Sequence, residues 1–284
     1  RVTDEARMTA IDYEAEYNNR ARVPEHPAHI VGWARDAAAY RATAKHETDL
    51  PYGDTPREKY DFFPAPEDSI APIGLFIHGG YWQALDKSFF SHMAAGPNAC
   101  GMSVAVAGYA LCPDVTMATI ANQLRQAALA VWRKTGRRVI AYGHSAGGHL
   151  AAMLLATDWK AFDAAAPDDV VVAGLSISGL FDLPPLVGTS INDKLGLDVA
   201  EARRLSPAFL KPNRNTQLTA FVGGAESAEY LRQSHLIVDA WAGKGCDTLY
   251  GEINGADHFT VIAGLAEARS ELTDALIWLA EQSS

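Results

Sequence analysis

The sequence predicts an α/β fold in which helices flank both faces of a doubly wound, mostly parallel sheet. From residue 73 onward, short apolar runs alternate with amphipathic helical patterns, as they do where helices connect parallel strands. These runs contain few polar residues, which is typical of strands that are buried on both faces. The chain of 284 residues is about twice a typical domain, yet it suits one large α/β core.

Residues 1–70 differ from the rest of the chain, because they are polar and rich in proline. One helical pattern follows Pro27, with apolar side chains at helical spacing from Ile30 to Tyr40. Because the segment has little apolar surface of its own, we expect it to form an arm or lid over the carboxyl edge of the sheet and to limit substrate size. The catalytic domain is expected at residues 71–284. The alternative is an arm on the back of the sheet or in the interface of a homodimer.

The core elements follow in order along the chain. Apolar residues between Met117 and Val131 recur every three to four positions, and Gly136 follows as a helix stop. The helical stretches lie between runs that we expect to be strands, at 73–77, 104–111, 139–142, 170–177, 218–222 and, more weakly, 248–253.

Charge and composition exclude several classes of function. Twenty-four basic against 34 acidic residues give a formal charge of −10, which repels nucleic acid and anionic lipid. No stretch approaches the roughly 18 to 20 apolar residues of a membrane helix. The three cysteines are widely spaced and predict buried thiols, not a disulfide framework or a metal site. We therefore expect a cytoplasmic protein with a small-molecule substrate and no cofactor.

The pentapeptide Gly-His-Ser-Ala-Gly at 143–147 lies between a predicted strand and a predicted helix. This is the context of a nucleophile elbow, in which a serine, here Ser145, sits in a sharp and strained turn. The flanking glycines are needed because side chains there would collide with the neighbouring strand and helix. The amino end of the helix also favours negative charge that develops near Ser145.

A second motif, His-Gly-Gly-Tyr-Trp at 78–82, closes the apolar run at 73–77. Glycines let the backbone approach a substrate closely and direct amide groups toward one point. We expect the N–H groups of Gly80, Tyr81 and Ala146 to form an oxyanion hole. The plainer alternative is an ordinary Gly-Gly turn after a strand.

The general base and its acid should follow the serine in the chain. Of the nine histidines, His258 alone lies in a loop after the last predicted strand and before a helix. Glu226 lies in the turn after the run at 218–222, where it can reach the far nitrogen of His258. Asp182 is the second choice for the acid, and Asp257 is too close to its neighbour to orient the ring.

The motifs at 78–82 and at 143–150 resemble those of α/β-hydrolase esterases of the kynurenine formamidase (arylformamidase) type. The similarity extends through 109–113, 178–183 and 257–259. It implies catalytic roles for Ser145, His258 and an acid at the position of Glu226, and a small ester or N-formyl amide, aromatic in character, as substrate. The acid is commonly Asp in that family, so Glu226 departs from its pattern toward bacterial esterase-like relatives.

Together these residues predict a serine hydrolase that works through an acyl-enzyme. Trp82 and Phe181, next to the motifs, are expected to line an aromatic substrate pocket. A thioesterase with the same triad and a catalytically silent binding protein on a hydrolase scaffold are the alternatives. A nucleotide-dependent oxidoreductase is disfavoured because no G-x-G-x-x-G opens a helix after a strand.

Overall fold

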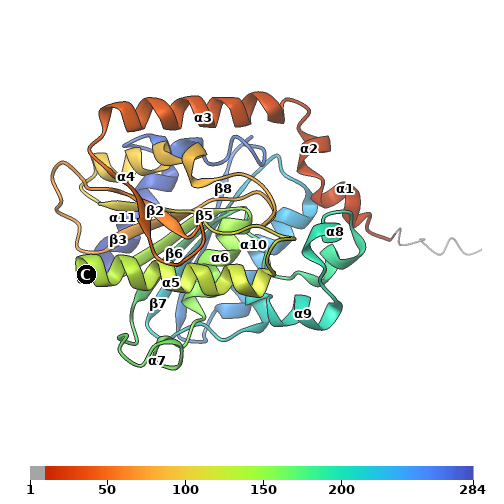
Figure 1. The fold of residues 1–284 in the computed structure, drawn as a ribbon. Coiled ribbons are helices and arrows are strands. Elements are labelled where there is room, and N and C mark those ends of the chain that lie inside the picture. Colours follow the sequence, from red (N-terminus) through yellow and green to blue (C-terminus); the bar gives the residue numbers. More distant parts are fainter. Residues whose placement is uncertain (1–9, 284) are drawn as a thin grey trace, which may run out of the picture.

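The structure, a computed structural model, describes residues 10–283 and has one eight-stranded sheet between two layers of helices (Figure 1). The strands lie in the order β1-β2-β4-β3-β5-β6-β7-β8. Strands β3 to β8 are parallel, and β1 and β2 are antiparallel at one edge. The expected α/β-hydrolase architecture with a mostly parallel sheet is thus confirmed. The strands are β1 (Glu47–Pro51), β2 (Lys59–Phe63), β3 (Ile73–Ile77), β4 (Val104–Ala107), β5 (Val139–His144), β6 (Val171–Ile177), β7 (Thr216–Gly223) and β8 (Cys246–Ile253).

Each of the six predicted runs overlaps with one strand, from β3 to β8. The run at 73–77 has the bounds of β3, whereas the run at 104–111 is a strand only as far as Ala107. The weak run at 248–253 belongs to a longer strand, because β8 pairs with β7 from Cys246 onward. Most of the sheet can therefore be predicted from short, mainly apolar runs, as expected for strands covered on both faces.

Two strands lie inside the segment that was expected to be an arm. β2 is buried from Tyr60 to Phe63 and pairs along its length with β4, and β1 extends the sheet by one more strand. The sheet therefore begins at residue 47, before the expected boundary at residue 70. The remainder of that segment holds the helices α1 (Tyr13–Tyr17), α2 (Asn19–Arg22) and α3 (His26–Thr43), and its residues 1–9 lie outside the described residues.

Helices α5, α6 and α10 cover one face of the sheet. The other face is covered by α4 and α11, and α3 packs on the short turns η1 (Lys87–Phe89) and η2 (Ser91–Ala94) of that layer, so that α3 and α5 lie on opposite sides in Figure 1. The helices are α1 (Tyr13–Tyr17), α2 (Asn19–Arg22), α3 (His26–Thr43), α4 (Ala95–Ala99), α5 (Met117–Thr135), α6 (Ala146–Leu155), α7 (Trp159–Phe162), α8 (Asn192–Leu195), α9 (Val199–Arg204), α10 (Ala228–Trp241) and α11 (Glu271–Gln282).

Helix boundaries follow the capping signals of the sequence. In α5, the Thr116 side chain accepts a hydrogen bond from the backbone N–H of Thr119, and Gly136 ends the helix in the left-handed region. The predicted helix near Pro27 is α3, which has that proline in its first turn. Within residues 10–283, no helix combines the length and the apolar character that a membrane crossing requires.

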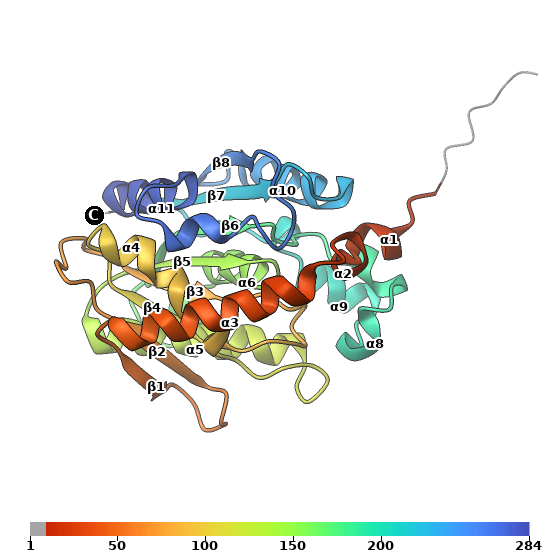
Figure 2. The ribbon, with the colours of Figure 1, turned by 90° about the horizontal axis from the view of Figure 1, so that it is seen from above.

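The topology of the sheet determines where a ligand can bind. β3 lies between β4 and β5, so the chain winds away from β3 in both directions. Open α/β sheets bind ligands outside the carboxyl ends of the strands at such a switch point. The loops after β3 and β5 carry the two glycine-rich motifs and leave the sheet there. Helices α1 and α2 lie at the same end of the molecule, where α1 contacts α10 (Figure 2).

Candidate active site

Ser145 forms a strained turn between β5 and α6. Its backbone has φ 57° and ψ −118°, a conformation that non-glycine residues rarely adopt. A Cβ atom on Gly147 would lie 1.9 Å from the carbonyl oxygen of Ile77, and one on Gly143 would lie 2.5 Å from the backbone of Gly147. The close crossing of β3, β5 and α6 therefore needs both glycines, and this geometry is that of a nucleophile elbow.

Glu226 and His258 are in direct contact at the carboxyl edge. His258 Nδ1 donates to Glu226 Oε2 over 2.7 Å, and both side chains are almost completely buried. The other carboxylate oxygen, Oε1, accepts from the Ser178 hydroxyl and from the Gly223 amide at 2.9 Å. These bonds hold the carboxylate in place, and the bond to Nδ1 leaves Nε2 of His258 as the nitrogen that can accept a proton.

The two other acids considered from the sequence have different partners. Asp182 forms an ion pair of 3.1 Å with Arg232. Asp257 accepts hydrogen bonds from the backbone N–H groups of Phe259 and Thr260, at 2.8 and 2.9 Å, and so shapes the loop that carries His258. The structure therefore brings only Glu226, of the three acids, to the imidazole.

Ser145 and His258 line the same cavity, which has a volume of about 310 Å³. Gly80 and Tyr81, from the loop after β3, line it as well. The segment that was expected to lie over the carboxyl edge of the sheet contributes lining residues from α1, α2 and α3, whereas the sequence did not predict the lining residues near and in α8. The lining residues of these helices include Tyr17, Asn18, Asn19, Arg20, Trp33 and Lys194.

The loop after β3, where the oxyanion hole is predicted, is tightly turned. Gly80, Tyr81 and Trp82 have positive φ angles of 110°, 49° and 58°. A Cβ atom on Gly80 would lie 2.3 Å from the carbonyl oxygen of Ala84, so the tight turn requires glycine. Within the described part of the chain, the N–H groups of Gly80, Tyr81 and Ala146 have no backbone acceptor. These three predicted donors are thus free for a ligand.

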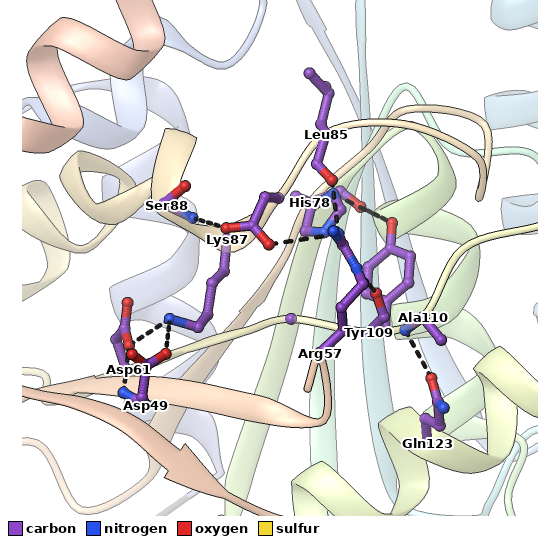
Figure 3. A network of polar contacts seen from close by, with 12 residues as sticks. Asp49, Arg57, Asp61, His78, Leu85, Lys87, Ser88, Tyr109, Ala110 and Gln123 are labelled. Atoms are coloured by element: carbon purple, nitrogen blue, oxygen red, sulfur yellow. Dashed lines mark hydrogen bonds and ion pairs between the residues drawn. The ribbon is translucent and has the colours of Figure 1, made fainter. Parts of the chain in front are cut away.

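A polar network holds the far side of this loop (Figure 3). The guanidinium of Arg57 donates to the carbonyl oxygens of Leu85 and Tyr109, both over 2.7 Å. The hydroxyl of Tyr109 in turn donates to the carbonyl oxygen of His78 at 2.7 Å. The turn between β1 and β2 therefore supports the His-Gly-Gly motif through Arg57, a role that the sequence did not predict.

Trp82 and Phe181, expected to line the substrate pocket, are fully buried and are not among the cavity residues. The positive φ of Trp82 turns its indole toward α6, where Nε1 donates to Nδ1 of His149 over 3.2 Å. His149 Nε2 donates to the carbonyl oxygen of Leu205 at 2.8 Å, so the imidazole is neutral, and burial lowers its pKa to about 4. The backbone N–H of Phe181 donates to Gln233 at 2.7 Å. Trp82 and Phe181 therefore pack beneath the loops after β3 and β6 and do not face the cavity.

The described residues, 10–283, contain no group of three or more His, Cys, Asp or Glu side chains that is arranged to hold a metal ion. The candidate site thus consists of a strained serine, a histidine paired with a buried carboxylate, and free backbone amides around one cavity.

Several known proteins are similar to this chain over most of its length, although no family model matches it. The kynurenine formamidase of Danio rerio is 30% identical over 258 residues, which cover 88% of this chain and 87% of that protein. The kynurenine formamidase of Salmo salar is 29% identical, with the same coverage.

Solved structures of other hydrolases are also similar to this chain. A crystal structure from a Silicibacter species, of a protein provisionally assigned as a thioesterase, has a TM-score of 0.84 and 33% identity, and the match covers 95% of this chain and 100% of that one. Esterase B of Lactobacillus rhamnosis has a TM-score of 0.68 at 19% identity, covers 96% and 99% of the two chains, and shares the fold. The coverage and identity of the first relative, together with the fold, establish that the chain belongs to the kynurenine formamidase family and is an α/β-hydrolase.

Proposed function

We propose that the chain is a serine hydrolase in which Ser145, His258 and Glu226 form the catalytic triad. The observation that carries this proposal is the 2.7 Å hydrogen bond from His258 to the buried Glu226, beside a cavity that His258 shares with Ser145. His258 Nε2 takes the proton of the Ser145 hydroxyl as its oxygen attacks a carbonyl carbon. Glu226 holds the ring in the required tautomer and stabilises the imidazolium that forms.

The tetrahedral intermediate carries a negative charge on the former carbonyl oxygen. The N–H groups of Gly80, Tyr81 and Ala146 are the proposed donors to this oxygen, supported by the amino end of α6. The intermediate collapses to an acyl-enzyme when His258 protonates the leaving group. Water then attacks the ester of Ser145 with His258 again as the base, and the acid product leaves.

We propose that the substrate is an N-formyl amide or carboxylic ester of a small aromatic compound. The relatives are named kynurenine formamidases, and the cavity wall contains the aromatic rings of Trp33 and Phe259. Two cations, Arg20 and Lys194, also line the cavity, and neither forms an ion pair among the described residues. This combination suits an aryl formamide that bears a carboxylate, such as N-formylkynurenine.

A thioester is the second candidate substrate, and the similarity to the provisionally assigned thioesterase favours it. Ester, formamide and thioester cleavage use the same triad, so the residues around Ser145 do not separate them. Rates with p-nitrophenyl esters, N-formylkynurenine and acyl thioesters, measured on the same preparation, decide which bond is preferred.

Replacement of the nucleophile tests the mechanism itself. We expect Ser145→Ala to lower kcat on the order of 10⁶-fold on every substrate of the panel. The fold should remain, because the elbow depends on the crossing at Gly143 and Gly147 and not on the hydroxyl. Circular dichroism and the thermal midpoint are the controls. Activity within tenfold of the wild type would exclude Ser145 as the nucleophile.

A further inference from the structure

The loop that carries two of the proposed oxyanion donors is held in a costly conformation. Tyr81 and Trp82 both have φ in the left-handed region, at 49° and 58°. Large side chains rarely adopt such angles, and they persist only where the surroundings fix the residue. Trp82 is fixed by its hydrogen bond to His149. Backbone hydrogen bonds from Gln83 to Gly80 and from Cys112 to Trp82 close the turn on either side of Tyr81, and the contacts of the Tyr81 side chain add to them in keeping its backbone in place.

The hydroxyl of Tyr81 belongs to a buried polar cluster, which also contains Tyr230 and Asn19. The Tyr81 hydroxyl donates to the carbonyl oxygen of Tyr17 over 2.6 Å and lies 2.6 Å from the Tyr230 hydroxyl. Asn19 Nδ2 lies 2.9 Å from the Tyr230 hydroxyl and 3.3 Å from that of Tyr81. Asn19 is only 6% exposed, and Tyr230 is fully buried.

The number of protons on each group determines which group donates and which accepts in every hydrogen bond of this cluster. Burial raises the pKa of Tyr81 and of Tyr230, so each hydroxyl keeps its single proton. Tyr81 gives its proton to a carbonyl oxygen, which cannot donate, and Tyr81 must therefore accept from Tyr230. The Asn19 nitrogen carries only donors, so Tyr230 accepts from Asn19. Asn19 is thus a donor at the start of the series, and the Ser145 hydroxyl is a further hydrogen-bond partner of Tyr230.

Asn19 is itself held firmly against α10. The neighbouring Tyr17 donates its hydroxyl proton to Glu229 over 2.6 Å and accepts from Gln233 at 2.8 Å. The backbone N–H of Glu229, in the first turn of α10, donates to the carboxylate of Glu16 at 3.0 Å. The Asn19 amide group is therefore presented from an anchored segment and not from a free arm.

We infer that Asn19 is a positioning residue for the oxyanion loop, and this inference rests on the function proposed above. Through the Tyr230 and Tyr81 hydroxyls, Asn19 keeps the Tyr81 backbone at its positive φ. The proposed Tyr81 N–H donor then stays where the oxyanion forms. An oxyanion hole works because its donors need not move during the reaction, so a loop that can relax stabilises the intermediate less well.

The direct test is Asn19→Leu, which removes the donor and keeps the number and branching of the side-chain heavy atoms. We expect kcat, counted per serine titrated with a phosphonate ester, to fall roughly 10- to 100-fold, since small displacements of catalytic groups have effects of this size. The KM should change less than about threefold, because Asn19, although it lines the cavity, is only 6% exposed. The Ki of a trifluoromethyl ketone, which forms an anionic tetrahedral adduct, should rise by the same factor as kcat falls. Inhibition by the acid product should not change.

A second variant keeps the test decisive if Asn19→Leu does not fold. Tyr81→Phe removes one oxygen atom and leaves the backbone amide, and it should raise the same Ki. Adding Asn19→Leu to Tyr81→Phe should cause little further change in kcat or in the Ki of the ketone, because both substitutions break the same series of hydrogen bonds. Tyr40→Phe is the matched control, since the Tyr40 hydroxyl also donates over 2.6 Å, to Asn98 Oδ1, and Tyr40 is not among the cavity residues. It should leave kcat and Ki unchanged.

Two results would overturn the inference. One is an unchanged Ki for the ketone in Asn19→Leu or Tyr81→Phe, and the other is losses that are fully additive in the double variant. A lower titrated fraction with normal kcat per site would mean that Asn19 only stabilises the fold, and it would overturn the inference too. Ser145→Ala separates this failure from that of the proposed function, because an active Ser145→Ala protein contradicts the triad whatever Asn19 does.

Discussion

At the scale of single residues, Glu226 is the acid whose carboxylate contacts His258. Its carboxylate accepts three hydrogen bonds, from Ser178, Gly223 and His258. We expect Glu226→Gln to lower kcat by about 10⁴-fold, because an amide neither stabilises the imidazolium nor secures the right tautomer. Asp182→Asn is the control and should have a much smaller effect, since Asp182 pairs with Arg232. A larger loss in Asp182→Asn would reverse the assignment of the acid.

The cations of the cavity wall give a second prediction. The one carboxylate among the lining residues, Glu14, already accepts two hydrogen bonds from Ser190, which lower its pKa. Arg20 and Lys194 thus remain available for a substrate anion. We expect each alanine variant to raise the KM for N-formylkynurenine about 5- to 10-fold and to leave the KM for the neutral p-nitrophenyl acetate unchanged. Lys244→Ala, outside this cavity, should change neither, and equal changes on both substrates would contradict the role.

The sequence predicts some site residues better than others for a physical reason. Ser145 and Gly80 are recognisable because their chemistry needs a local pattern of glycines at a strand end. The side-chain direction of Trp82 depends on the sign of its φ, which the residue type does not reveal, and its indole consequently lies under the loop. Tyr17 and Asn19 reach the site through partners more than 200 residues away, and no local pattern records such contacts.

At the scale of elements, the crossing of β3 and α6 can be tested through its glycine. A Cβ atom on Gly147 would meet the Ile77 carbonyl at 1.9 Å, and neither backbone can move without shifting the elbow. We expect Gly147→Ala to lower the free energy of unfolding by about 3 kcal/mol or more. Gly188→Ala is the control, because nothing lies within 4 Å of the added atom, and it should cost about 1 kcal/mol or less. Urea unfolding of both variants measures the difference.

Strands buried on both faces were predictable, whereas β2 was not. β3 reads as an unbroken apolar run, but β2 contains Lys59 and Asp61. Asp61 is only 2% exposed and is neutralised by Lys87, which lies 2.7 Å away and comes from a different loop (Figure 3). A buried charge with a distant partner looks like a surface residue in the sequence. The expected arm therefore extended too far along the chain.

At the scale of the whole molecule, buried neutral histidines make stability depend on pH. Burial lowers the pKa values of His78, His92 and His149 to about 4. Because the unfolded chain binds these protons near pH 6.5, it holds more protons than the native state at lower pH. The stabilisation is therefore complete above pH 6.5 and is lost as the pH falls toward 4.

This pH dependence can be measured by urea unfolding between pH 7 and pH 5, where most carboxylates stay ionised. We expect the free energy of unfolding to decrease by on the order of 2 kcal/mol for each of the three histidines. In His149→Gln the decrease between pH 7 and pH 5 should be smaller by about 2 kcal/mol, the contribution of one histidine, even if the variant is less stable at every pH. An identical slope in the variant would show that His149 is not kept neutral.

The anchoring of α1 and α2 on α10 also has a consequence for the order in which the chain folds during translation. Tyr17 and Asn19 leave the ribosome early, but their partners Glu229 and Tyr230 are made 212 and 211 residues later. During translation these two side chains therefore lack their partners on α10 until residues 229 and 230 have been made. His258 emerges later still. A chain that ends before α10 therefore lacks the anchor of α1 and α2, so this part of the cavity wall is fixed only after most of the sheet has been made.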